Sequence, residues 1–161
     1  LVFLAFLAGD FPKVKRETSL AFRKAFPYNI KQEDVFMKEI LMTRLYGSIE
    51  AGGTKFVCAI GDDSFSVIEQ TQFPTTNPQE TIANCIAFFK PFAKDLVGLG
   101  IGSFGPIDID PDSATYGYIT STPKPGWANV DLLGGLRNAL KLPMYFTTDV
   151  NSSAYGEMMA R

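Results

Sequence analysis

A pair of adjacent glycines between two apolar runs most constrains how this chain can fold. Residues 50–55 read Glu-Ala-Gly-Gly-Thr-Lys, and they separate the apolar runs 46–49 and 56–60. Two glycines at such a place predict a tight strand-to-strand turn, because a backbone without Cβ atoms bends sharply and lets a ligand approach closely. The N–H groups of such a turn, with the Thr54 hydroxyl and the Lys55 ammonium, suit phosphate oxygens, while Glu50 could hold a hydrated Mg²⁺. A plain Gly-Gly hairpin without a ligand is the other interpretation.

The composition indicates one globular domain with a substantial core. The chain has 161 residues, of which 46% are hydrophobic and 20% are charged. A net charge of −2 gives no reason to expect nucleic acid or an anionic membrane as a partner. The apolar residues 1–8 are far fewer than the roughly 20 that a membrane-spanning helix needs. We therefore predict neither a nucleic-acid partner nor a membrane partner.

The chain contains no histidine and two cysteines, Cys58 and Cys85. Each cysteine is flanked by hydrophobic residues, which is typical of buried thiols in a reducing cytoplasm. A Cys/His zinc site and a His-dependent catalytic triad are excluded within these residues. Any chemistry here must use carboxylates, hydroxyls, lysines and backbone dipoles.

The patterning of the chain changes near residue 45. We interpret residues 1–45 as a poorly patterned, non-native or upstream-translated extension, with the true start at Met42; a clipped signal peptide is the alternative. From residue 46 onward the pattern is regular. It predicts strands at 46–50, 55–61, 65–73, 96–102 and 143–147, and helices at 78–92, 130–140 and from Thr148 or Asp149 onward, with Asn77 as an N-cap. This order predicts an α/β fold, a mixed sheet covered by helices. Because the last helix has no return strand after it, we expect an unfinished domain.

Residues 103–129 are irregular and contain four prolines and three glycines. A connection this long in a compact domain is more often functional than idle. Gly105, Pro106 and Asp108 follow a predicted buried strand, where ligands gather in α/β sheets. A Pro-Gly-rich structural turn is the alternative for each of these residues.

Six blocks carry a resemblance to a known family: 49–59, 73–75, 100–108, 116–120, 122–127 and 148–151. Taken in this order, they resemble the ROK family of sugar kinases, on its fructokinase-like branch. The resemblance covers about residues 46–161 and implies an actin-like, also called ribonuclease-H-like, fold with two lobes around a cleft. Residues 46–161 would then be the N-terminal lobe, and the C-terminal lobe would be missing.

The resemblance implies roles for three polar residues. Asp149 matches the general base that takes the proton from the attacking sugar hydroxyl, and a carboxylate where a strand ends and a helix begins suits that task. A simple N-cap is the bland alternative for Asp149, and the two roles are compatible. Asn151 matches a residue that holds the sugar or its loop. Glu50 stands where many relatives have Asp, so it is a weaker Mg²⁺ candidate.

The same resemblance divides the remaining candidates between nucleotide and sugar. Residues expected to meet the ATP phosphates are Gly52, Gly53, Thr54 and Lys55. Residues expected to line the sugar pocket are Gly105, Pro106, Asp108, Lys124 and Trp127. Trp127 could stack on a sugar ring, although a lone Trp is usually a core residue. The pair 147–148 is Thr-Thr where relatives carry Asn, which leaves one expected sugar contact in doubt.

The function implied is ATP-dependent phosphorylation of a hexose, most like fructose to fructose 6-phosphate. ATP and Mg²⁺ are the expected cofactors, and the intact family suggests a cytoplasmic homodimer. The family also implies zinc, but its ligands are absent from this chain, as are the Glu-x-Gly-His element and the second phosphate turn. We therefore expect this fragment to be inactive alone. The alternatives are a glucose, mannose or N-acetyl sugar kinase, and a sugar-sensing transcriptional regulator, although residues 1–45 lack a clear helix-turn-helix pattern.

Overall fold

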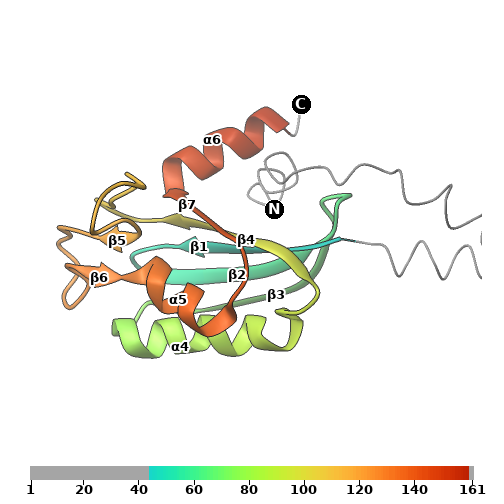
Figure 1. Cartoon of the computed structure of the whole chain (residues 1–161), viewed down its shortest axis with the longest axis horizontal. Coiled ribbons are helices and arrows are strands. Elements are labelled where there is room, and N and C mark those ends of the chain that lie inside the picture. The colour runs from blue at the N-terminus through green and yellow to red at the C-terminus, as the bar shows by residue number, and fades with distance from the viewer. Residues whose placement is uncertain (1–43, 160–161) are drawn as a thin grey trace, which may run out of the picture.

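The computed structural model describes residues 44–159 and contains a five-stranded mixed sheet (Figure 1). The strand order is β3-β2-β1-β4-β7, in which β1 is antiparallel to β2 and parallel to β4. The strands are β1 (Leu45–Ala51), β2 (Lys55–Gly61), β3 (Val67–Pro74), β4 (Leu96–Ser103) and β7 (Met144–Thr148). The predicted mixed α/β sheet is confirmed. The predicted N-terminal extension lies, except for its last two residues, outside the described part of the chain.

Two turns join the first three strands. The turn between β1 and β2 closes with a hydrogen bond from the Gly52 N–H to the Lys55 carbonyl at 3.0 Å. In the next turn the Asp62 carboxylate accepts hydrogen bonds from the backbone N–H groups of Ser64 and Ser66. This carboxylate cap, with Phe65 at a positive φ of 64°, makes the turn longer than the pattern predicted. Strand β3 therefore begins at Val67 and not at residue 65.

Helix α4 (Pro78–Phe89) begins and ends for local reasons. Its predicted N-cap is confirmed, because the Asn77 side chain accepts a hydrogen bond from the Glu80 N–H at 2.9 Å. The predicted extension to residue 92 is wrong as an α-helix. The chain tightens into a 3₁₀ turn, η1 (Lys90–Phe92), because Pro91 has no N–H with which to continue the α-helical ladder.

The other two helices start beside strands. Helix α5 (Leu132–Leu140) begins two residues later than predicted, because Asp131 serves as its N-cap and accepts from the Gly134 N–H at 2.7 Å. The two preceding residues form β6 (Val130–Asp131), which pairs with β5 (Tyr118–Ile119). Helix α6 (Asp149–Met159) follows β7 without a loop.

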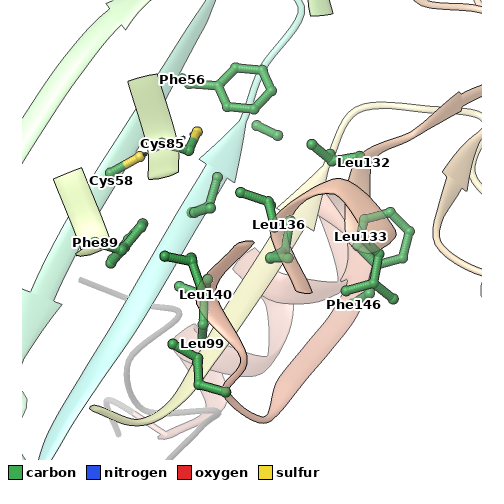
Figure 2. Packing of buried hydrophobic residues seen from close by; sticks show 14 of the residues in the cluster. Phe56, Cys58, Cys85, Phe89, Leu99, Leu132, Leu133, Leu136, Leu140 and Phe146 are labelled. Atoms are coloured by element: carbon green, nitrogen blue, oxygen red, sulfur yellow. Dashed lines mark hydrogen bonds between the residues drawn. The ribbon is translucent and has the colours of Figure 1, made fainter. Parts of the chain in front are cut away.

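The helices cover the sheet from both sides. Helices α4 and α5 lie on one face, and α6 lies on the other, at the end of β7 (Figure 1). The core between the sheet, α4 and α5 contains Phe56, Cys58, Leu99 and Phe146 from strands and Cys85, Phe89, Leu133 and Leu136 from helices (Figure 2). Each large apolar side chain buried there contributes about 1.5–3 kcal/mol to stability.

The two cysteines are buried free thiols, as predicted. Their sulfur atoms, on β2 and α4, are 3.8 Å apart. The Cys58 pKa is raised, first by its contact with the Cys85 thiol and then by burial. The Cys58 thiol therefore stays protonated, and both cysteine side chains act as packing groups in the core.

No helix among residues 44–159 is long and apolar enough to cross a membrane.

Candidate active site

Two carboxylates predicted to act at the site, Glu50 and Asp149, line one hollow of about 470 Å³. Val150, Ser153 and Ala154 of α6 complete its lining. The hollow lies where the parallel strands β1, β4 and β7 end, side by side (Figure 1), which is the usual ligand position in α/β sheets. The structure thus brings together the proposed general base and the proposed metal ligand from opposite ends of the described sequence.

The register of the sheet explains why Glu50 faces this hollow. Glu50 of β1 pairs with Gly102 of β4, and Gly102 pairs with Thr147 of β7. Their neighbours Ile49 and Ile101 belong to the core beneath α4 and α5. Because successive side chains of a strand point to opposite faces, Glu50, Gly102 and Thr147 belong to the face that α6 covers.

The first turn of α6 fixes Asp149. The Thr148 hydroxyl accepts a hydrogen bond from the Asn151 N–H at 3.1 Å, so Thr148 takes the capping role. The Asp149 carboxylate accepts from the Val150 N–H at 2.8 Å and is half-buried. The Asn151 side chain is exposed and donates to the Thr147 hydroxyl at 3.4 Å. Its sugar contact stays a prediction.

The Gly-Gly turn lies two residues beyond Glu50, at the same edge of the sheet. A Cβ at Gly52 would lie 2.7 Å from the Lys55 carbonyl oxygen, so this position needs glycine. At Gly53 an added Cβ would meet nothing within 4 Å, so the backbone there is open to a ligand. The turn residues are not among those that line the hollow of Glu50 and Asp149. Their contact with ATP phosphates stays a prediction.

Lys55 is engaged elsewhere in this conformation. From β2, its ammonium donates to the side-chain oxygen of Gln72 on the neighbouring edge strand β3, at 3.2 Å. Strand β3 lies on the side of β2 that is remote from Glu50. Both Lys55 and Gln72 are exposed, so this contact is weak and a phosphate could replace it.

Thr75 holds the Gly-Gly turn, a role that the sequence analysis did not assign. Its hydroxyl donates to the Gly52 carbonyl at 2.7 Å, and its N–H donates to the Thr54 carbonyl at 2.9 Å. The side chain is buried, with 7% of its surface exposed. The only signal for it in the sequence is its place in the block 73–75.

The prediction that Trp127 stacks on a sugar ring is wrong. Its side chain is fully buried between Phe56 and Phe104, with ring centroids 5.6 Å and 5.5 Å away. The indole N–H donates to the Thr76 carbonyl at 2.8 Å. The core alternative is therefore confirmed. Trp127 supports the chain beside Thr75 and the Gly-Gly turn from within the core.

Asp108 fastens its own loop. Its carboxylate accepts hydrogen bonds from the Ser113 hydroxyl at 2.5 Å, the Thr115 hydroxyl at 2.6 Å and the Asp110 N–H at 3.0 Å. These donors lower the Asp108 pKa, the Ser113 hydroxyl most of all. The structure thus gives Asp108 a structural role, and its sugar contact stays a prediction.

We expect Asp108→Asn to lower the thermal midpoint at neutral pH and to make it less sensitive to acid. A folded-state pKa below the unfolded value of about 3.9 means that the carboxylate stabilises the fold above that pH. This stabilisation is lost as the pH falls through the lowered folded-state pKa. The gap in midpoint between wild type and variant, measured from pH 7 to pH 2.5, should therefore narrow below about pH 4.

Asp112→Asn is the matched control for this experiment, because only the backbone N–H of Asp112 takes part in the recorded loop bonds. Its midpoint should follow the wild type throughout. A gap between wild type and Asp108→Asn that stays constant down to pH 2.5 would contradict the assignment.

The other predicted sugar-pocket residues are accessible. Gly105 and Pro106 are exposed directly after β4, joined by a cis peptide bond. Lys124 is half-buried, and its carbonyl accepts from the Trp127 N–H at 3.2 Å. Their contact with a sugar stays a prediction.

A second hollow, of about 520 Å³, lies between α4 and residues 126–131. It contains none of the predicted site residues and is lined largely by apolar side chains such as Ile82, Ile86 and Val130. We therefore place the candidate site at the carboxylates and not here.

Comparison with known proteins places this geometry in a family. The sequence model of the ROK family matches residues 46–161. The chain is 68% identical over 120 residues to a fructokinase of Streptococcus mutans, a match that covers 74% of this chain and 41% of that protein. It is 60% identical over 117 residues to a fructokinase of Lactococcus lactis, covering 73% of this chain and 40% of that protein. The chain thus spans about two fifths of the length of these relatives.

A solved structure agrees in fold. The ROK family glucokinase of Streptomyces griseus, crystallised with glucose and AMPPNP, superposes with a TM-score of 0.58 at 21% identity. The match covers 73% of this chain and 36% of that one. It supports the predicted actin-like α/β fold class. With a family match that extends from residue 46 to residue 161, the chain belongs to the ROK family.

Proposed function

We propose that residues 46–161 form the N-terminal lobe of an ATP-dependent hexose kinase whose substrate is fructose. The observation that carries this proposal is that Glu50 and Asp149 line one hollow. Glu50 lies two residues before the Gly-Gly turn, whose backbone is open at Gly53, and the chain belongs to the ROK family. Fructose is favoured over other hexoses because the two relatives above are both named fructokinases.

In this reaction Asp149 acts as the general base. Its carboxylate takes the proton of the fructose 6-hydroxyl while the hydroxyl oxygen forms a bond to the γ-phosphorus of ATP. The bond from that phosphorus to the bridging oxygen breaks, and ADP leaves with the bonding electrons. A carboxylate held by the start of a helix has the fixed position that proton transfer needs.

The turn and Glu50 receive the phosphates. The open backbone at Gly53, the Thr54 hydroxyl and the Lys55 ammonium offer donors for phosphate oxygens. Glu50 fits a hydrated Mg²⁺, since it is exposed to the hollow and Mg²⁺ needs only one or two carboxylates beside phosphate oxygens. When bound, Mg²⁺ would offset the charge of the phosphates. The described residues contain no group of three or more His, Cys, Asp or Glu side chains that could hold a metal ion. In this proposal, phosphate oxygens and water would complete the coordination of Mg²⁺ beside Glu50.

Zinc does not fit the described residues. Cys58 and Cys85 face each other in the core, and the 161 residues contain no histidine. We assign no step to zinc.

The sugar side of the site is assigned to Gly105, Pro106, Lys124 and Asn151, with Asp108 and Trp127 as supports of the loop. For the whole enzyme we propose a cytoplasmic homodimer. Two buried free thiols agree with a reducing compartment.

A chimera tests the proposed function. Residues 46–161 replace the matching segment of the S. mutans fructokinase, and a coupled assay measures ATP-dependent phosphorylation of fructose, glucose, mannose and N-acetylglucosamine. We expect fructose to have the highest kcat/KM. A folded chimera without activity on any sugar would contradict the kinase assignment, and a preference for another sugar would contradict the choice of fructose.

The 161-residue chain on its own should have no measurable kinase activity. Its sequence corresponds to about two fifths of the relatives, so only one side of a two-lobed cleft is present in it. The same coupled assay checks this, with the chimera as positive control. Fructose phosphorylation by the purified 161-residue chain would overturn the expectation.

A further inference from the structure

Strand β4 and helix α6 approach each other unusually closely at Gly102. A Cβ built on Gly102 would overlap the Ser152 hydroxyl oxygen and would lie 2.9 Å from the Ser152 Cβ. The next nearest atom is the Cα of Asp149, at an ordinary contact distance of 3.6 Å. The missing side chain of Gly102 is therefore what lets the first turn of α6 rest on the sheet.

Ser152 connects this contact to Asp149. Its side chain is buried, with 5% of its surface exposed, so it is held against β4. Its hydroxyl donates a hydrogen bond to the carbonyl oxygen of Asp149 at 2.7 Å. One face of Ser152 thus touches the sheet, and its hydroxyl holds the residue on which the proposed chemistry depends.

The register turns this contact into a constraint on the site. Gly102 pairs with Glu50 on one side and with Thr147 on the other. The height of α6 above Gly102 therefore decides where Asp149 lies relative to Glu50 across their common hollow. Neither neighbour of Gly102 in this row can move to compensate, because both are hydrogen-bonded strand residues.

We propose that Gly102 and Ser152 are a matched pair of positioning residues that set the place of Asp149. This inference rests on the proposed kinase function, in which Asp149 is the base. Neither residue needs to touch a substrate. Their role is to fix the spacing between the sheet and the start of α6.

The geometry defines a graded series of variants. Gly102→Ala brings its new Cβ against both side-chain atoms of Ser152. Gly102→Ala with Ser152→Ala removes the hydroxyl but keeps the 2.9 Å contact with the Ser152 Cβ. Gly102→Ala with Ser152→Gly removes both close contacts, and the next nearest atom is the Asp149 Cα at 3.6 Å. The matched control is Gly135→Ala in α5, where the nearest atom to an added Cβ is 3.6 Å away, in Ile82.

The activity arm of the test uses the chimera described above. A displaced base costs about 100-fold in rate, so Gly102→Ala should lower kcat by about that factor, while the KM values for fructose and ATP change little. The kcat of the double variant with Ser152→Gly should be at least about tenfold higher than that of Gly102→Ala, and the kcat of the double variant with Ser152→Ala should rise by less. Gly135→Ala should match the wild type. An unchanged kcat in Gly102→Ala, or no recovery with Ser152→Gly, overturns the proposal.

The structural arm separates this inference from the proposed function. In a crystal structure of the 161-residue chain, Gly102→Ala should shift the start of α6 away from β4, and Gly102→Ala with Ser152→Gly should restore it. An inactive wild-type chimera would count against the kinase assignment alone. The position of Asp149 in the crystal structures would still test whether Gly102 and Ser152 position this residue. If Gly102→Ala does not fold, the Ser152→Gly double variant should fold with α6 in place. Failure of both variants to fold overturns the proposal.

Discussion

Asp149→Asn should lower the kcat of the chimera for fructose by about 10²–10⁴-fold, the usual contribution of a general base. Asn has the same shape as Asp and can still accept the hydrogen bond from the Val150 N–H. It cannot take the proton of the sugar hydroxyl. The KM values for fructose and ATP should therefore change little, and a coupled assay at saturating substrate measures the effect on kcat.

The matched control for this variant is Asp63→Asn. Asp63 is exposed in the turn between β2 and β3, at the edge of the sheet away from the hollow. Its kcat should equal that of the unsubstituted chimera. If Asp149→Asn retains more than about a tenth of the activity, Asp149 is not the base.

Trp127→Ala should have the largest effect on stability, lowering the free energy of unfolding by about 3–5 kcal/mol. The variant leaves a cavity between Phe56 and Phe104, because the indole is fully buried there. It also leaves the Thr76 carbonyl without its indole donor. Urea denaturation of the 161-residue chain measures the change.

Two further variants separate packing from hydrogen bonding. Trp127→Phe keeps an aromatic ring in the core but removes the indole donor to the Thr76 carbonyl. It should lower the free energy of unfolding by about 1–3 kcal/mol, the cost of leaving a buried carbonyl unsatisfied. Ile68→Ala removes a large apolar side chain that is 54% exposed, and it should change stability by no more than about 0.5 kcal/mol. If Trp127→Ala lowers the free energy of unfolding by less than about 1 kcal/mol, the core role of Trp127 is contradicted, and the sugar contact becomes the better interpretation.

Local signals predicted the elements well where a few neighbouring residues decide the conformation. The hydrogen bond that closes the Gly-Gly turn and the one that forms the Asn77 N-cap each join residues within four positions along the chain, and both features were confirmed. The misplaced boundaries also have local causes. The Asp62 carboxylate lengthens one turn, and Pro91 converts the end of α4 into a 3₁₀ turn. A side-chain hydrogen bond in the first case and a missing backbone N–H in the second are features that hydrophobic periodicity does not record.

The site was predictable only in part. Asp149 was singled out by resemblance, and Glu50 both by its place before the Gly-Gly turn and by resemblance. The fold places the two on one hollow. Thr75, Gly102 and Ser152 escaped notice as functional candidates, because each acts through a residue distant in sequence. For Trp127, the resemblance suggested a sugar platform although a lone Trp is usually a core residue, and its full burial shows that the core position is correct.

Short-range patterns in the chain were enough to predict the strands of the main sheet and the three helices in order, and with them the α/β class, while the family came from resemblance. The small pair of strands β5 and β6 was not predicted. They could not define which side chains meet, because those contacts join residues far apart in the chain. The indole of Trp127 reaches a carbonyl 51 positions away, and Gly102 is adjacent to Glu50 only through the register of parallel strands. Strand pairing and close packing decide such contacts, since a shift of one residue turns each side chain to the other face of the sheet.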